Sequence, residues 1–250
     1  MARGLGTRSR FLVAYLLLGA AVGTGIGVFV VLLQRPGPEP PPRWSSWKPP
    51  TGSTLVTTQQ IAVHVGSTYR LPSGNRLNRI VIGAPGQAQN TVRAIGIQKT
   101  LQPKNLGDFD LYDQNRSVMY VMCGGVGKDC KITEGEASVE RGTVLRREAL
   151  ELALYTLKYA KPIDNVVVFV PPGPKETKLS SALFFRRQDL AAELDKPLRT
   201  TLPHSRPPLP GGIDPAEKTT VDALTAERLF RYLGVANAND FGQVVVLQPA

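Results

Sequence analysis

The longest apolar stretch of the chain lies near its N-terminus. Residues 11–33, FLVAYLLLGAAVGTGIGVFVVLL, contain no charged side chain, and a helix needs about 20 apolar residues to cross a bilayer core. A cleaved secretory signal is the alternative, but its apolar core usually covers only about 7–15 residues. The length therefore favours a single, uncleaved membrane-spanning helix over residues 11–33.

Shorter apolar runs separated by polar turns follow from residue 51 onwards. The segment 57–71 fits both a strand and a helix, and Thr57 with Gln60 three positions later resembles a capping box, which favours a helix. Continuous or alternating apolar runs bounded by Gly, Pro or Asn indicate strands. These runs predict strands within residues 75–86, 90–98, 117–123, 165–170, 181–190 and 243–248.

Two segments have helical periodicity. Residues 138–160 place apolar side chains over more than half of the helix circumference, with Arg147, Glu151 and Lys158 on a narrow polar side. So wide an apolar face predicts a central helix that packs on two sides. Residues 220–234 are predicted to form a second amphipathic helix that ends at Gly234.

Strands and helices in this order predict an α+β fold for one domain over residues 51–250. A mixed sheet that includes the segments 117–123, 165–170 and 243–248 is expected to be covered by the two main helices. Residues 202–215 form a long irregular loop, and such loops are either functional or ordered by packing. Strand order does not follow from the sequence.

A proline-rich segment, residues 34–50, connects the apolar stretch to this domain. Seven of its seventeen residues are proline, which predicts a semi-rigid stalk of up to about 50 Å at roughly 3.1 Å per residue. Trp44 and Trp47 lie at its end, where they suit a membrane interface, a partner-binding motif or docking onto the domain. An extended stalk carries them away from the membrane, so docking onto the domain is favoured.

The charges flanking the apolar stretch indicate its orientation. Residues 1–10 contain Arg3, Arg8 and Arg10 and no acid, as expected of a cytoplasmic segment. The other flank also carries positive charge, so the asymmetry is incomplete. The predicted topology is a single-pass cell-membrane protein with a cytoplasmic N-terminus and an extracytoplasmic domain.

The net charge of +10 raises the question of nucleic-acid binding. Residues 1–50 hold six Lys and Arg against one acid, and residues 51–250 hold 24 against 19. Half of the excess therefore belongs to the first 50 residues, and no basic run is interleaved with stacking aromatic residues. We predict no nucleic-acid partner, and attraction to an anionic membrane surface or wall polymer instead.

The chain has two cysteines, Cys123 and Cys130, in the segment CGGVGKDC. They suit a disulfide, free thiols, or a metal or redox site. The spacing is not C-x-x-C, and the two histidines, His64 and His204, lie far from the pair in sequence, whereas structural zinc needs four ligands. Because extracytoplasmic thiols are commonly oxidised, we predict a structural disulfide, worth about 2.5 kcal/mol on the chain-entropy model.

Glycines repeat every four residues within the apolar stretch, at Gly19, Gly23 and Gly27. Two consecutive G-x-x-x-G spacings leave one helix face without side chains, which allows close helix packing. Glycine is also common in membrane helices. The pattern predicts either a homo-oligomer or a partner membrane helix at this face.

Acidic residues are the remaining candidates for chemistry. Asp108, Asp110 and Asp113 resemble the start of a calcium loop but lack its glycine and closing glutamate, so a solvated turn is predicted. Glu136, with other acids before residue 138, suits a helix start. Glu148 lies at the border of the apolar helix face, and a salt bridge to Arg186, Arg187 or another charge is expected because a buried carboxylate needs a partner; a binding pocket is the alternative.

The sequence contains no nucleophile elbow, Walker loop, dinucleotide fingerprint or zinc-protease motif. We therefore predict a non-catalytic binding or assembly protein of the cell envelope, with an envelope protein or polymer as partner and no cofactor. The alternative is a membrane-tethered hydrolase that uses Glu136 and Glu148 as its carboxylates.

Overall fold

The computed structural model describes residues 7–34, 43–85, 92–100, 102–125, 130–176, 178–204, 206–238 and 242–250. Positions 35–42 of the predicted proline-rich stalk lie outside these residues. The chain divides into two units, residues 1–42 and 43–250. Each unit is described by itself.

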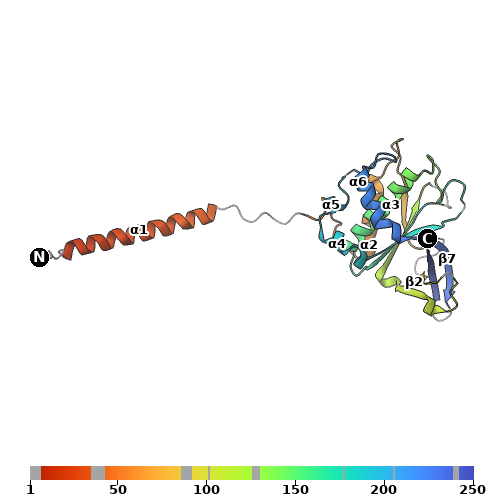
Figure 1. Cartoon of the computed structure of the whole chain (residues 1–250), viewed down its shortest axis with the longest axis horizontal. Coiled ribbons are helices and arrows are strands. Elements are labelled where there is room, and N and C mark those ends of the chain that lie inside the picture. The colour runs from red at the N-terminus through yellow and green to blue at the C-terminus, as the bar shows by residue number, and fades with distance from the viewer. Residues whose placement is uncertain are drawn as a thin grey trace. The chain divides into compact units, whose positions relative to one another are not determined.

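The first unit contains one helix, α1 (Thr7–Gln34) (Figure 1). Its segment Phe11–Val30 is long and apolar enough to cross a membrane, a property that it shares with a signal sequence near an N-terminus. Side chains along this segment are exposed. A Cβ atom added at Gly19, Gly23 or Gly27 meets nothing within 4 Å, so the glycine face of α1 is open.

The second unit is an α+β domain built on a mixed sheet of eight strands in the order β1-β4-β5-β6-β7-β8-β2-β3 (Figure 1). The pairs β4–β5 and β2–β8 are parallel, and the other neighbouring strands are antiparallel. The strands are β1 (Arg79–Ile82), β2 (Val92–Gln98), β3 (Phe109–Asp113), β4 (Ser117–Cys123), β5 (Asn165–Phe169), β6 (Ser181–Arg186), β7 (Leu229–Ala238) and β8 (Gly242–Pro249).

Helices cover one face of the sheet. The longest, α3 (Val139–Tyr159), connects the parallel strands β4 and β5 and packs between α2 and α6. Its N-cap is Ser138, whose side chain accepts the backbone N–H of Arg141. The other helices are α2 (Thr54–Thr68), α4 (Ala191–Asp195), α5 (Leu198–Thr201) and α6 (Pro215–Thr225).

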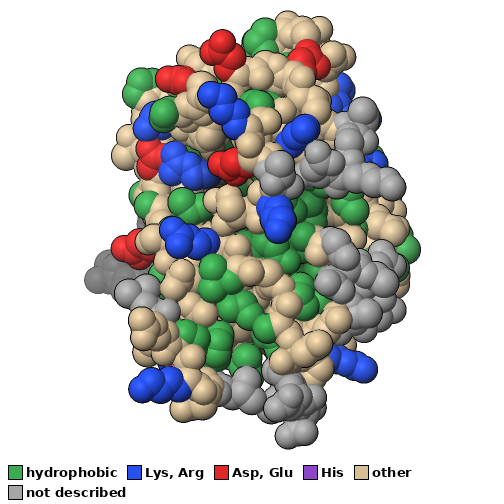
Figure 2. Space-filling model, turned by 90° about the vertical axis from the view of Figure 1, so that its right-hand side faces the viewer, with side chains coloured by type: hydrophobic (Ala, Val, Ile, Leu, Met, Phe, Trp, Pro, Cys, Tyr) green, Lys and Arg blue, Asp and Glu red, His purple; other side chains and the backbone are tan. Residues whose placement is uncertain are grey.

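Alternation along the strands divides the apolar residues between two clusters. Val166 and Val168 of β5 point into the cluster beneath the helices, whereas Val167 and Phe169 point into a second cluster on the opposite face. The sheet coils around this second cluster, since Tyr112 of β3 contacts Phe184 of β6 with ring centroids 4.8 Å apart. Figure 2 shows hydrophobic side chains gathered at the centre of one side of the domain, with Lys and Arg around them.

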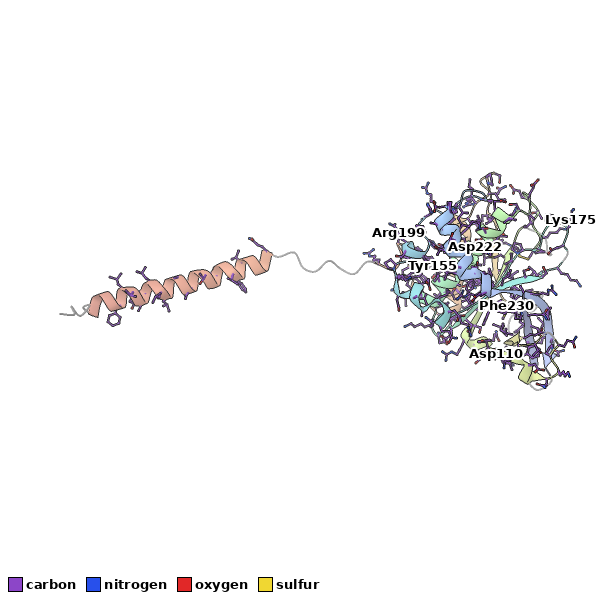
Figure 3. The ribbon with its side chains drawn as sticks, in the orientation of Figure 1. Asp110, Tyr155, Lys175, Arg199, Asp222 and Phe230 are labelled. Carbon is purple, nitrogen blue, oxygen red and sulfur yellow. A yellow bond between two sulfur atoms is a disulfide. The ribbon has the colours of Figure 1, made fainter. Side chains whose placement is uncertain are left out.

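The tryptophans after the proline-rich segment dock onto the domain, as predicted. Trp44 makes edge contacts with Tyr155 and Tyr159 of α3 at centroid distances of 5.4 and 5.5 Å, and Figure 3 labels Tyr155 among the helices. Trp47 stacks on His64 of α2 at 3.9 Å. The chain is therefore fixed to the helical layer as soon as it enters the domain.

The predicted helix over residues 220–234 is wrong in its second half. Helix α6 ends at Thr225, and residues 229–238 form β7, which pairs with β8 along its length. Leu224, Leu229 and Leu233 fit a helical period, but Phe230 and Tyr232 alternate and pack into the sheet cluster. Gly234 has a φ of +122° at a register shift of β7, so it serves a bulge and not a helix end.

Two smaller predictions also need correction. Thr57 does not cap α2, because the helix begins earlier and Ser53 is the N-cap, accepting the backbone N–H of Val56. The acidic segment around Asp110 is not only a turn, since residues 109–113 form β3, which pairs with β2. Both errors arise because strand pairing and helix packing override local signals.

Candidate functional site

A pocket lies beside the carboxyl end of β4. Its volume is 410 Å³, and we call it the β4 pocket. Ligands commonly bind beyond the carboxyl ends of strands in sheets with parallel connections, and β4 is one of the two parallel strands that α3 joins. The lining residues are Leu71, Arg76, Leu77, Asn78, Arg79, Cys123, Gly124, Gly125, Thr133 and Glu134.

Close backbone packing shapes one wall of the pocket. A Cβ atom at Gly124 would lie 2.8 Å from the Cα atom of Ile132, and one at Gly125 would lie within 3 Å of the Thr133 side chain. The two glycines therefore let the segment after Cys130 return against the end of β4. Backbone N–H groups of Gly124 and Thr133 donate to the carbonyls of Cys130 and Gly124, at 3.0 and 3.3 Å.

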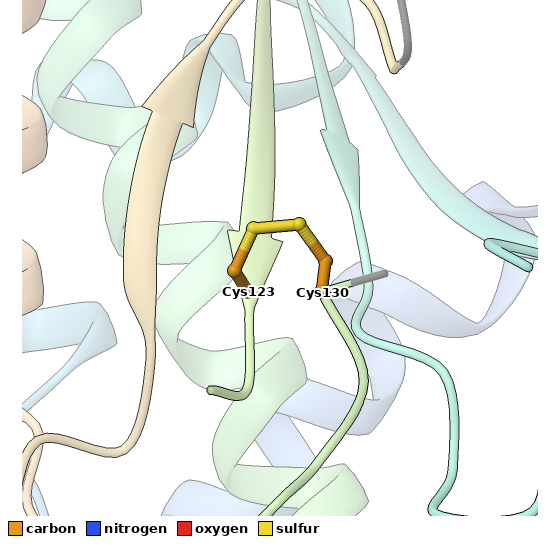
Figure 4. The surroundings of a disulfide bond; sticks show 2 residues. All are labelled: Cys123 and Cys130. Atoms are coloured by element: carbon orange, nitrogen blue, oxygen red, sulfur yellow. A yellow bond between two sulfur atoms is a disulfide. The ribbon is translucent and has the colours of Figure 1, made fainter. Parts of the chain in front are cut away.

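The two cysteines meet at this wall. The Sγ atoms of Cys123 and Cys130 are bonded at 2.02 Å, so the structure closes the cysteine loop as predicted (Figure 4). Cys123 is the last residue of β4 and is 1% exposed, with its side chain in the sheet cluster. The disulfide therefore links the edge of the core to the pocket wall.

Three arginines gather beside the pocket. Arg76 and Arg79 line it, and Arg70 faces Arg76 across an isolated β-bridge. Like charges directly opposite one another in a strand pair are destabilising. All three side chains are exposed, and within the described part of the chain no ion pair joins any of them to an acid.

Glu134 is the one acidic residue in the lining, and it is already engaged. Its carboxylate accepts hydrogen bonds from the Ser73 hydroxyl and from Asn75 Nδ2 at 3.0 Å. These hydrogen bonds lower the pKa of Glu134, so it is ionised near neutral pH. One carboxylate faces two arginines in the lining, which leaves the pocket with net positive charge.

A buried polar cluster lies behind the pocket, formed by Asn78, Arg141 and Glu148. All three side chains are 2% exposed or less. Asn78 Nδ2 donates to Glu148 Oε2 at 2.6 Å, and Arg141 Nη1 donates to the backbone carbonyl of Glu134 at 2.5 Å. Four atoms are buried and have no hydrogen-bond partner among the described residues: Asn78 Oδ1, Glu148 Oε1, Arg141 Nε and Arg141 Nη2.

Burial raises the pKa of Glu148 to about 8, with a smaller contribution from the charge of Glu151, while the hydrogen bond from Asn78 and the charges of Arg141 and Arg147 oppose the shift. At neutral pH the carboxyl is therefore mostly protonated. When the carboxyl of Glu148 is protonated, it can donate a hydrogen bond from Oε1. Asn78, which donates to Glu148 Oε2, has an acceptor, Oδ1, without a partner among the described residues. A neutral Glu148 carboxyl does not cancel the charge of Arg141.

A second buried network is centred on Arg147, the residue before Glu148 in α3. Arg147 is 1% exposed and donates from Nε to Glu217 Oε1 at 2.7 Å, and from Nη1 to Glu151 Oε2 at 3.1 Å and to the Tyr69 hydroxyl. Tyr69 donates in turn to Glu151 at 2.6 Å. His204, which is half exposed, contacts Glu217 Oε2 at 2.6 Å. The network therefore joins α2, α3, α6 and the long loop after α5.

The structure gives partners to these charges that the sequence does not identify. Arg147 and Glu151 do not form an exposed polar side of α3, because α6 and the loop after α5 cover them. Glu148 does not pair with Arg186 or Arg187. Those arginines pair with Asp189 and Asp164 at 2.8 and 3.0 Å, while Glu148 points toward Asn78 at the entry of β1.

The structure places the two predicted carboxylates in different surroundings. Glu136 is exposed in the segment before α3, whereas Glu148 is fully buried in the helix. Glu136 precedes α3, which begins at Val139, and Glu148 lies nine positions after Val139, or about 13 Å along the helix axis. Of the two, only Glu148 belongs to the cluster behind the β4 pocket.

Sequence reasoning missed Asn78, Arg141 and the arginines of the pocket. Asn78 and Glu148 are 70 positions apart, so only the pairing of β1 with β4 and the packing of α3 bring them together. One signal was present, since three arginines fall within residues 70–79. Comparisons with protein-family models, curated proteins and solved structures find no match to this chain.

Proposed function

We propose that the protein is a membrane-anchored binding or assembly component of the cell envelope, with its domain outside the cytoplasm. The observation that carries the proposal is the β4 pocket, which has a volume of 410 Å³. Arg76 and Arg79 line it without an acidic ion-pair partner among the described residues, and the buried polar cluster of Asn78, Arg141 and Glu148 lies behind it. Such groups hold and orient a polar ligand. The apolar segment Phe11–Val30 supplies the anchor, and the bonded cysteine pair suits an oxidising compartment.

The proline-rich segment acts in this proposal as a stalk. Its last residues are fixed by Trp44, whose carbonyl accepts the backbone N–H of Leu198 at 2.6 Å and whose ring lies 5.6 Å from Lys158 Nζ. In this proposal the proline-rich segment is a spacer that connects the membrane anchor to the domain. The partner is an envelope protein or an envelope polymer.

Site-specific photocrosslinking in living cells tests the proposal. A photoreactive amino acid at Thr133, in the pocket lining, is expected to give a discrete crosslinked product in the envelope fraction. The same residue at Arg199, which is exposed on α5 outside the lining, serves as the control. Equal products at both positions, or no product at Thr133, would contradict a partner at this pocket.

The glycine face of α1 provides a second contact in this proposal, through a homo-oligomer or a partner membrane helix. Gly19, Gly23 and Gly27 leave the helix surface open to close approach. Gly23→Leu is expected to abolish self-association of α1 in a membrane reporter assay, whereas Leu17→Ala, outside the glycine face, is expected to keep it. Unchanged association of the Gly23→Leu variant would exclude this face as the contact.

A further inference from the structure

We propose that the β4 pocket binds a phosphate group of an envelope component. This inference deepens the proposed function and rests on it. The shared chemistry is a phosphate ester, which a soluble or polymeric envelope molecule and an anionic lipid headgroup both carry.

The first step of the argument concerns charge. Arg76 and Arg79 line the pocket without acidic partners in the described residues, and Arg70 adds a third guanidinium across the bridge from Arg76. Arginine presents planar, paired donors that match phosphate oxygens. A bound phosphate anion reduces the repulsion among these side chains, which the single carboxylate of Glu134 offsets only in part.

The second step concerns the buried groups. The Arg141 side chain donates a hydrogen bond to the backbone carbonyl of Glu134. The Nε and Nη2 donors of Arg141 have no partner among the described residues, although the side chain is only 2% exposed. Among the described residues, the acids whose charges act on Arg141 are Glu134 and Glu148. Glu134 is occupied by Ser73 and Asn75, and Glu148 shares its buried position with Asn78. The positive charge behind the pocket is therefore retained.

The third step concerns shape. Leu71 and Leu77 give the lining of the pocket an apolar part beside its arginines. The volume of 410 Å³ exceeds what a phosphate alone fills, since ligand pockets for small organic molecules begin near roughly 300 Å³. A phosphate joined to an organic group suits both the charge of the arginines and the apolar part of the lining.

Binding measurements on the purified full chain test this inference. The protein is held in nanodiscs of phosphatidylcholine and titrated with glycerol 3-phosphate in a calorimeter at low salt. A second arm measures its co-sedimentation with vesicles of pure phosphatidylglycerol, with pure phosphatidylcholine vesicles for comparison. Saturable binding in the first arm indicates a soluble or polymeric phosphate ester, and binding in the second arm alone indicates a lipid headgroup.

Matched variants locate the binding. Arg76→Gln with Arg79→Gln is expected to weaken binding about a hundredfold, because each charge-assisted contact is worth about tenfold or more. Arg93→Gln with Arg231→Gln removes the same charge from exposed strand positions outside the lining, and binding is expected to change less than twofold.

Absence of saturable binding in both arms would overturn the inference, and so would equal weakening by both pairs of variants. If phosphate fails to bind while the crosslink at Thr133 persists, the pocket has a partner of another chemistry. If phosphate binds and the crosslink is absent, the ligand class is right and the assembly role is wrong.

Discussion

Replacement of Arg147 by methionine is expected to lower the free energy of unfolding by about 3–5 kcal/mol. The change keeps an unbranched side chain of moderate length but removes the cation between Glu151 and Glu217, whose side chains are 14% and 0% exposed. The two carboxylates then keep only the Tyr69 hydroxyl and His204 as partners, and the Tyr69 hydroxyl loses a donor. Urea unfolding of the full chain in detergent at pH 7 measures the loss.

The neighbouring residue provides the control for this prediction. Arg146 pairs with Asp222 at 2.7 Å, and both side chains are at least a quarter exposed. Arg146→Met removes the same charge from the same helix and is expected to cost less than about 1 kcal/mol. Combining Arg147→Met with Glu217→Gln is expected to recover part of the loss. Equal costs for Arg146→Met and Arg147→Met would show that the buried network does not hold α3 against α6.

Glu148→Gln is expected to stabilise the protein at alkaline pH. Burial raises the pKa of Glu148 to about 8 in the folded state, from a value near 4.5 in the unfolded chain. Between these pH values folding takes up a proton, so the contribution of Glu148 to stability is present below pH 4.5 and is lost as the pH rises through 8. At about 1.36 kcal/mol per pH unit, the loss reaches roughly 5 kcal/mol as an upper bound.

Glutamine has the shape of the protonated acid and cannot ionise, and its amide supplies one donor and one acceptor to Asn78. The stability of Glu148→Gln relative to the unsubstituted protein is therefore expected to increase by several kcal/mol between pH 4.5 and pH 9. Glu136→Gln makes the same change at an exposed position and is expected to leave the difference flat. Parallel pH profiles for Glu148→Gln and the unsubstituted protein would refute the buried neutral carboxyl.

The elements that the sequence predicts well are those whose burial is visible within one segment. Residues 166–170 are apolar without interruption because β5 is covered on both faces, and residues 138–160 have an apolar arc wide enough for a central helix. The α+β class follows from these segments. The strand order does not, because it depends on pairings such as β2 with β8 that join distant parts of the chain.

The candidate site could be predicted only in part. The cysteine pair is local, and its closure could be predicted from the spacing and from the compartment that the sequence predicts. The burial of Arg147 could not be predicted, because the polar stripe of α3 on which it lies gives no indication that α6 covers it. Arg76 and Asn78 lie two residues apart but have opposite surroundings, one exposed and one buried. These residues form a pocket and a buried cluster only because the fold places the 70–79 segment next to the end of β4 and next to α3.

Thiol labelling of intact cells tests the central claim, a disulfide-closed domain outside the cytoplasm, most directly. A membrane-impermeant maleimide is applied before and after an impermeant reductant, with Cys123→Ser and Cys130→Ser variants identifying the labelled positions. The account predicts labelling of intact cells only after reduction. Labelling that requires cell lysis, with both thiols free without reduction, would place the domain in the cytoplasm and contradict both the topology and the closed cysteine loop.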